Sequence, residues 1–308
     1  MSFATILGLG QTALELGLMN SLVVLSLFLS YSMLNVCDLS TDGCFTLGAA
    51  VGAMVAIAGH PYLSLPVAMA AGMCSGFVTA LLQTRMGVDS LLAGIVVNTG
   101  LYSVNIAIMG GKSLVNLNKT PTVFSILKEA FKPTPLKGYE TLVICVIAVA
   151  LTVLFLSWFL RTRLGLSIRA TGNNPDMVRS SSINPIMTTT VGLTVSNAFT
   201  ALSGCLLAQS QKSADINIGS GILTVALASL LIGGVFFGRR RIPMRAVGAV
   251  IGAFLFRLVY AVALRMNMPS FMLKATSSVI VILAMFIPYL KRQYPNFARR
   301  LEARKEAR

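Results

Sequence analysis

The sequence predicts an all-α protein, a polytopic bundle of transmembrane helices, and three observations lead to this fold class. Of the 308 residues, 55% are hydrophobic and only 11% are charged, which is too few charges for a soluble surface of this size. The apolar runs reach the ~20 residues that a helix needs to cross a hydrocarbon core of about 30 Å. Strand-type alternation is absent, which favours a helical bundle over a membrane barrel.

About nine apolar segments follow one another, and we expect each to form a helix within a single transmembrane domain, residues 1–308. In chain order they span approximately Leu14–Leu34, Phe45–Gly59, Leu63–Leu82, Leu91–Met109, Thr141–Leu160, Met187–Ala208, Ile222–Phe237, Ala246–Leu264 and Phe271–Leu290. An odd number of segments places the two ends of the chain on opposite sides of the membrane.

The second segment, Phe45–Gly59, is short for a full crossing and follows the polar stretch Cys37–Gly43. Two carboxylates and a glycine ahead of a short apolar helix favour a broken or half-length helix whose N-terminus faces a protein-lined cavity, because loose backbone cannot face lipid. The alternative is an ordinary cytoplasmic turn in which Asp and Ser act as caps.

Three pairs of glycines have the spacing GxxxG: Gly48 and Gly52, Gly72 and Gly76, and Gly248 and Gly252. In apolar helices this spacing lets two backbones approach closely. We expect helix contacts at these faces, either inside the bundle or in a dimer.

The net charge of +15 is distributed unevenly between the loops. When the loops are assigned alternately to the two sides, one side receives about twice as many Lys and Arg residues as the other. The positive-inside rule then places the loop 161–185 and the charged tail 291–308 in the cytoplasm, and the N-terminus outside. Membrane lipid, and not nucleic acid, is the neighbour that this charge implies.

The outer loop Gly110–Gly138 is also basic, and it either docks an acidic partner or is simply solvated.

The loop 161–185 contains two helix start signals about ten residues apart. Asn174 followed by Pro175 predicts an N-cap with proline at the first helical position, and Asp176 sits where the helix dipole favours an anion. Asn184 and Pro185 repeat the signal. A helix of about two turns is therefore expected between them. It is too short to be stable alone and too polar to insert, so it needs the membrane surface or the groove of a partner. The alternative is a solvated connecting loop.

No catalytic or metal site is expected. The five cysteines lie in or beside apolar runs without metal-type spacing, and the single histidine, His60, precedes a proline in a short loop. The tripeptide at Gly111 resembles the end of a phosphate-binding loop, but Ile106 stands where that loop requires glycine. We expect no cofactor in this chain.

The motifs of this sequence resemble those of permease subunits of binding-protein-dependent ABC importers, the branched-chain amino acid and ribose type. In the cytoplasmic loop the resemblance rests on Thr162–Gly165, Arg169–Asn174 and Ser181–Asn184. Cys37-Asp38-Leu39-Ser40 looks like the signature that opens the broken helix of that family. The stretches Asp38–Gly48 and Arg257–Pro269 are most similar to the tryptophan/tyrosine transport subgroup.

The resemblance implies that the short helix is a coupling helix, the lever through which a separate ATPase moves the membrane helices. The residues expected to contact the ATPase are Gly172, Asn173, Asn174, Pro175, Asp176, Met177, Val178, Arg179, Ser182 and Asn184. Ser182 departs from the family pattern, which usually has glycine at that place, so the end of the coupling helix is expected to differ.

The implied partners are an ABC ATPase that binds the ATP, an extracytoplasmic substrate-binding protein and a second copy of the permease. The expected location is the bacterial inner membrane, and the expected substrate is an amino acid, with sugars and nucleosides still open.

Four residues are candidates for the translocation pathway: Asp38, Ser40, Asp42 and Arg257. Arg257 falls near the middle of a predicted span, where a cation costs about 2.5 to 3.5 kcal/mol on insertion scales. It should therefore face a cavity or find a partner, for which Asp42 and Asp215 are candidates. Either Arg257 lines the pathway and meets a substrate carboxylate, or it forms an interhelical ion pair.

Two other classes of protein fit the sequence less well. An ion-coupled secondary transporter needs acidic or histidine relays buried at mid-depth, whereas Glu15, Asp38, Asp42 and Asp215 are all expected near span ends. A membrane enzyme needs a cluster of His, Asp or Glu at the mouth of a span, and the chain has one histidine.

Overall fold

The structure is a computed structural model that describes residues 3–130, 139–237, 241–265, 275, 278–283 and 286. In this part of the chain it has eleven α-helices, one π-helical turn and two short strands. In order these are α1 (Phe3–Leu27), η1 (Phe28–Met33), α2 (Thr41–Ile57), α3 (Ser64–Thr84), α4 (Ser90–Ile108), β1 (Leu114–Asn116), α5 (Val123–Ala130), α6 (Glu140–Phe159), α7 (Arg163–Asn173), α8 (Pro175–Ser180), α9 (Pro185–Gln211), β2 (Ser213–Asp215), α10 (Ile222–Phe237) and α11 (Ile242–Arg265).

The predicted helical membrane bundle is confirmed in its main features. Within the described residues, six helices are long and apolar enough to cross a membrane: α1 continued by η1, α3, α4, α6, α9 and α11. The helices α2 and α10 are apolar but shorter. Eight of the predicted segments coincide with these helices, whereas Phe271–Leu290 lies mostly, and the tail 291–308 entirely, outside the described residues. The count of nine segments stays a prediction.

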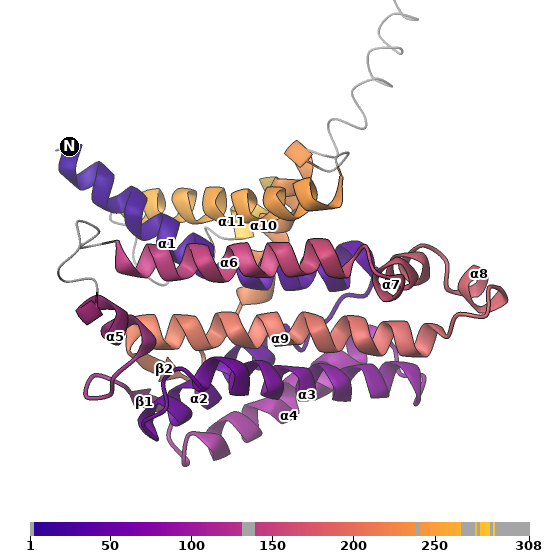
Figure 1. Ribbon diagram of the computed structural model, residues 1–308, viewed down its shortest axis with the longest axis horizontal. Coiled ribbons are helices and arrows are strands. Elements are labelled where there is room, and N and C mark those ends of the chain that lie inside the picture. Colours follow the sequence, from indigo (N-terminus) through magenta and orange to yellow (C-terminus); the bar gives the residue numbers. More distant parts are fainter. Residues whose placement is uncertain are drawn as a thin grey trace, which may run out of the picture.

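The long helices lie side by side along the longest axis of the molecule (Figure 1). Helices α1, α6, α10 and α11 form one group, and α2, α3, α4 and α9 form the other. Helix α9 contacts α1, α2, α3 and α7, so it is the central element. Helices α7 and α8 lie at one end of the molecule. The strands, α5 and the beginning of α1 lie at the opposite end (Figure 1).

The GxxxG contacts form inside the bundle. A Cβ at Gly48 would collide with the carbonyl group of Ala201 in α9, and one at Gly72 or Gly76 would meet other backbone carbonyls of α9. The third pair packs against α10, where a Cβ at Gly252 would collide with the Ser229 carbonyl. Of the two predicted alternatives, the structure therefore shows the intramolecular one. In lipid the hydrophobic effect does not drive helices together, so the close packing of their backbones stabilises these contacts instead.

Hydroxyl groups connect the two groups of helices at the seam between α1 and α9. Ser26 Oγ lies 2.8 Å from Ser196 Oγ and 2.7 Å from Thr200 Oγ1, and all three residues are buried. One turn further on, Ser203 Oγ donates to the carbonyl oxygen of Met19 at 2.6 Å. These bonds satisfy polar groups that would otherwise be unpaired in an apolar interior.

The end with the two strands contains structure that the sequence analysis missed. Strand β1 pairs antiparallel with β2, with Leu114 opposite Asp215. Helix α5 follows, and the buried Gln209 at the end of α9 accepts a hydrogen bond from the backbone N–H of Val123 at 3.0 Å. The described part of the predicted outer loop is thus folded onto the bundle, because its apolar Leu117 and Phe124 are buried.

Candidate functional site

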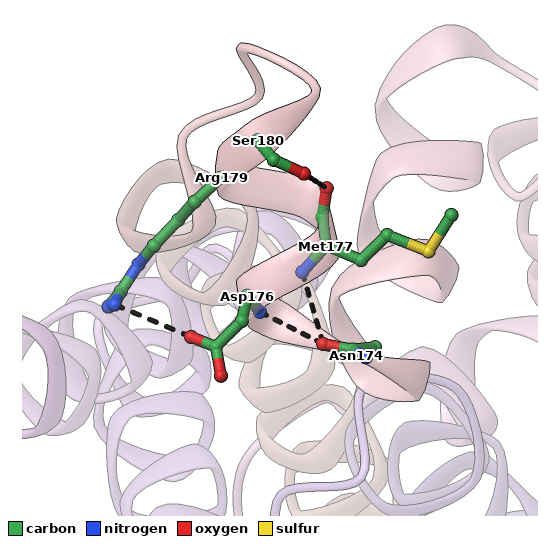
Figure 2. A network of polar contacts seen from close by, with 5 residues as sticks. All are labelled: Asn174, Asp176, Met177, Arg179 and Ser180. Carbon is green, nitrogen blue, oxygen red and sulfur yellow. Dashed lines mark hydrogen bonds and ion pairs between the residues drawn. The ribbon is translucent and has the colours of Figure 1, made fainter.

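Helix α8 begins at the cap that the sequence predicts. Asn174 has an extended backbone, and its Oδ1 atom accepts hydrogen bonds from the backbone N–H groups of Asp176 and Met177, both at 3.1 Å (Figure 2). Pro175 occupies the first helical position, where its missing N–H group costs nothing. Asn184 caps α9 in the same way, accepting from the N–H of Ile186 at 2.9 Å. The sequence prediction of two successive helix starts is confirmed.

Helix α8 ends at Ser180 with Ser181 as its C-cap, and Ser182, the position where the chain departs from the family pattern, follows directly. Ser182 has φ 61°, in the left-handed region that favours glycine. Its N–H group donates to the carbonyl of Arg179 at 3.2 Å, and the N–H of Ile183 donates to the carbonyl of Val178 at 3.2 Å. This pair of bonds is the Schellman motif. The helix end was expected to differ because of this serine, but it still closes with the Schellman motif, at the cost of a strained backbone conformation at Ser182.

Helix α8 is held to the molecule by one side. Val178 is buried, whereas 68% of Met177 is exposed. Arg179 Nη1 lies 3.7 Å from Asp176 Oδ1, and both side chains are mostly exposed, so this pair adds little stability. The helix projects from the end of the molecule (Figure 1), with Met177 and Arg179 pointing away from each other (Figure 2).

A helix that the sequence analysis did not predict supports α8. Helix α7 packs so tightly that a Cβ at Gly165 would collide with the Phe159 carbonyl, and one at Gly172 would collide with the Met33 carbonyl. Ile168 is fully buried, and Thr171 Oγ1 lies 2.8 Å from Thr188 Oγ1 of α9. The end of η1, α7 and the start of α9 therefore form one packed unit beneath α8.

Inside the bundle, two half-length helices begin at the same place. Helices α2 and α10 have 17 and 16 residues, or about 25 Å each. Asp42, in the first turn of α2, accepts hydrogen bonds from the N–H groups of Gly221 (3.0 Å) and Leu223 (2.8 Å) at the start of α10. We call this place the half-helix junction. Of the two sequence interpretations, the structure agrees with the half-length helix, whereas the protein-lined cavity at its N-terminus stays a prediction.

The two half-helices run toward opposite ends of the molecule. Helix α2 contacts β2. Helix α10 leads to α11, whose Arg245 Nη2 donates to Ser32 Oγ of η1 at 2.7 Å, at the α7 end. A half-helix N-terminus carries partial positive charge, so the junction combines two such ends with the Asp42 carboxylate.

Asp38 lies behind the junction, in the break between η1 and α2, and it is 1% exposed. Its Oδ1 atom accepts from the backbone N–H (2.8 Å) and the hydroxyl (2.6 Å) of Ser40, which is also buried. Its Oδ2 atom accepts from Asn197 Nδ2 of α9 at 2.7 Å. Thr79 of α3 donates to Ser40 Oγ at 3.3 Å. The break between η1 and α2 is therefore tied to α9 through the buried carboxylate and to α3 through the Ser40 hydroxyl.

The position of Asp38 corrects one expectation. The sequence analysis placed Asp38 near the end of a span, but its partner Asn197 lies near the middle of the 27-residue α9. The error arose because the sequence does not reveal that the chain turns back into the bundle after Leu34. The absence of a carboxylate at mid-depth therefore no longer counts against a secondary transporter, and the choice between the two classes rests on the family comparison.

The expected partners of Arg257 are also corrected. Asp42 is used by the start of α10, and Asp215 Oδ1 accepts from the N–H of Asn217 at 2.6 Å. Neither forms an ion pair with Arg257. The guanidinium instead lies 5.5 Å from the ring centroid of Tyr260, and its Nε has no hydrogen-bond partner among the described residues. A cation at this depth without a carboxylate is costly, which is typical of functional positions.

The described residues contain no group of three or more His, Cys, Asp or Glu that could hold a metal ion. The Ser40 hydroxyl donates to the Asp38 carboxylate, but both residues are buried. The described part of the chain is a multi-pass helical bundle with interrupted helices and a short exposed helix at its basic end. These features define the class as a membrane transport protein.

Comparison with known proteins gives the family. The model of the family described as the permease component of branched-chain amino acid transport systems matches residues 12–290, and the chain belongs to this family. It is accordingly the permease component of an ABC-type importer, a multi-pass protein of the bacterial plasma membrane, and its family is one of transport subunits and not of enzymes.

The chain is similar to a tyrosine transport system permease protein of Clostridioides difficile, with 30% identity over 85% of each chain. It is 27% identical to the ribose import permease protein of Escherichia coli K12, over 71% of this chain and 67% of that one. An uncharacterized protein of Rickettsia prowazekii is 32% identical, over 82% and 86%. No solved structure gives a significant match.

Proposed function

We propose that this permease carries an amino acid across the membrane and is driven by a separate ATPase that binds α8. The observation that supports this most directly is the construction of α8. It is capped at both ends, anchored through the single buried side chain of Val178, and exposes Met177 at the end of the molecule. A two-turn helix of this kind requires a binding partner to be held firmly.

The proposed contact surface for the ATPase consists of Gly172, Asn173, Asn174, Pro175, Asp176, Met177, Val178, Arg179, Ser182 and Asn184. Three of these residues determine the local backbone structure. Gly172 allows the close approach to Met33, and Asn174 and Asn184 cap the helices α8 and α9. Because Asn184 starts α9 directly after α8, a displacement of α8 is passed to the central helix of the bundle.

The proposed translocation pathway runs along the half-helix junction. Asp42 is partly exposed there, and the neighbouring Asn217 and Ser220 are exposed. Irregular backbone and a carboxylate at membrane depth cannot face lipid. A second copy of the permease is therefore proposed to cover this face, with the substrate passing between the copies. In this arrangement Asp38 and Ser40 hold the junction in place, and Arg257 offers a cation to the substrate carboxylate.

The proposed orientation places α7 and α8 in the cytoplasm and the beginning of α1 outside. The exposed basic residues at the α8 end, including Arg161 and Arg179, support it through the positive-inside rule. The strand-bearing end then receives substrate from an extracytoplasmic binding protein, and its basic residues Lys112 and Lys119 suit an acidic docking surface. The name of the tyrosine transport relative supports an amino acid, and an aromatic one, as the substrate.

Crosslinking in membranes tests the proposal. A cysteine replacing Met177 should be crosslinked to a co-expressed nucleotide-hydrolysing subunit, whereas a cysteine replacing Lys112 at the opposite end should not. Uptake should require that subunit, and Arg257→Leu should abolish uptake without loss of expression. Failure of Met177→Cys to capture the ATPase, or unimpaired uptake by Arg257→Leu, would contradict the corresponding role.

A further inference from the structure

A groove lies on the outer surface of the bundle, between the last turns of α3 and the first turns of α9. Its volume is about 450 Å³, and its lining includes Phe77, Leu81 and Arg85 from α3 and its C-cap, and Asn184, Met187 and Val191 from α9. The two helices pack backbone to backbone at Gly72 and Gly76, and the groove lies beyond these contacts, toward the C-terminal end of α3. It therefore opens on the side of α8.

The lining changes character along the groove. Phe77 lies about two turns deeper than Arg85, and it is 50% exposed although it sits at the depth of the acyl chains. Arg85, which follows the last residue of α3, is the only charged residue of the lining, and it is exposed. The first turn of α9 adds the partial positive charge of a helix N-terminus at the same level. The groove is therefore apolar along its length and positively charged at its opening at the membrane surface.

We propose that this groove binds one anionic phospholipid, with an acyl chain along Phe77, Leu81 and Val191 and the phosphate at Arg85. A protein segment would have to satisfy its own backbone groups there, whereas an acyl chain has none. The mouth matches the charge of a phosphate, and the lining contains no carboxylate that would repel it.

The groove also touches the coupling segment. Asn184 lines it and is at the same time the N-cap of α9, two residues after the strained Ser182. A lipid bound there restrains the link between α8 and α9. This regulatory effect rests on the proposed function, whereas the lipid site itself does not.

The chain allows a direct fluorescence test because Trp158 is its single tryptophan. In the Trp158→Phe background, Leu81→Trp places the only tryptophan in the groove. Val78→Trp is the matched control, since Val78 lies on the same helix one turn away, is 49% exposed and does not line the groove. The full-length variants are reconstituted in bilayers that contain brominated phosphatidylglycerol or brominated phosphatidylcholine at equal mole fraction.

We expect the tryptophan at 81 to be quenched with about fivefold higher apparent affinity by the anionic lipid, the factor that one cation near the surface provides. Arg85→Gln should remove this preference for the anionic lipid. The tryptophan at 78 should show little preference for either lipid, both with Arg85 and in the Arg85→Gln variant. Equal quenching by both lipids at 81 would overturn the proposal. So would protection of position 81 from both quenchers, which would indicate that a second protein copy fills the groove.

Circular dichroism and the elution volume of each variant establish that it is folded before quenching is read. The test needs neither ATPase nor substrate, so its failure leaves the proposed transport function standing. Conversely, a quenching preference together with absent ATP-driven uptake would contradict the transport proposal and leave the lipid site intact.

Discussion

Helix α8 and the half-helix junction use polar residues in opposite ways. At α8 the polar groups are exposed, the ion pair of Asp176 and Arg179 faces water, and one buried side chain anchors the helix. At the junction Asp38 is buried, and its two carboxylate oxygens accept three hydrogen bonds. The difference supports the proposal that another protein completes α8, whereas the Asp38 carboxylate is paired within the chain.

The largest expected effect separates these two regions by stability. Asp38→Ala leaves the Ser40 N–H and Asn197 Nδ2 buried without their acceptor, and we expect the free energy of unfolding to fall by about 3 kcal/mol. Asp176→Ala removes an exposed pair and should leave stability unchanged. Thermal unfolding in detergent measures both. Similar melting temperatures for the two variants would show that the junction is not the more firmly held region.

A second comparison examines how tightly α9 is packed beside the junction. Gly48→Ala places a methyl group against the backbone of Ala201, and we expect a loss of about 2 kcal/mol in unfolding free energy. Gly100→Ala in α4, where nothing lies within 4 Å of the added atom, is the control and should be tolerated. If Gly48→Ala melts like Gly100→Ala, the close contact between α2 and α9 is not needed.

A third prediction concerns the two caps, which share their chemistry and differ in their surroundings. Asn174→Ala should destabilise α8 by about 1 kcal/mol, because two N–H groups lose their acceptor. Hydrogen exchange at Asp176 and Met177 should quicken, while the melting temperature of the whole protein stays the same. Asn184→Ala should cause less exchange, since α9 is packed along its length. Equal changes at both caps would contradict an α8 that is held mainly by its own cap.

The smallest expected effect is at the end of α8. Ser182→Gly relieves the left-handed strain but gives the unfolded chain more freedom, so we expect a net stabilisation of only about 0.5 kcal/mol. Slower exchange of the Ile183 amide would report it. Ser181→Gly, at a residue with φ −90°, is the control and should not slow exchange. Faster exchange in Ser182→Gly would show that the serine side chain itself stabilises this end.

Local signals made much of the fold predictable from the sequence. The asparagine caps, the prolines and the apolar runs act within a few residues of the position that they determine, and α8 and the start of α9 followed from them. The family motifs predicted the family, which the comparison confirms. Helix α7 was missed because it is short and mixes apolar with polar and basic residues. It lies against the bundle through the close contacts of Gly165 and Gly172 and the buried side chain of Ile168.

What the sequence could not supply were the long-range pairings. The bond between Asp38 and Asn197 joins positions 159 residues apart, and nothing near either residue indicates the other. The bonds between Asp42 and the start of α10 are equally long-range. Because Asp42 accepts these bonds, it does not pair with Arg257 as expected. A carboxylate near the end of an apolar run can lie at mid-depth when the chain turns back, and only the three-dimensional path decides this.

The pairing of β1 with β2 has a consequence for the assembly of the protein during synthesis. Leu114–Asn116 leaves the ribosome long before Ser213–Asp215 does, and α6 and α9 must be inserted between them. Until Gln209 arrives, the Val123 amide lacks this acceptor and α5 lacks its contacts with α9. The strand-bearing end is therefore completed late, so a protease added to arrested nascent chains should cut the chain near β1 until α9 is in place.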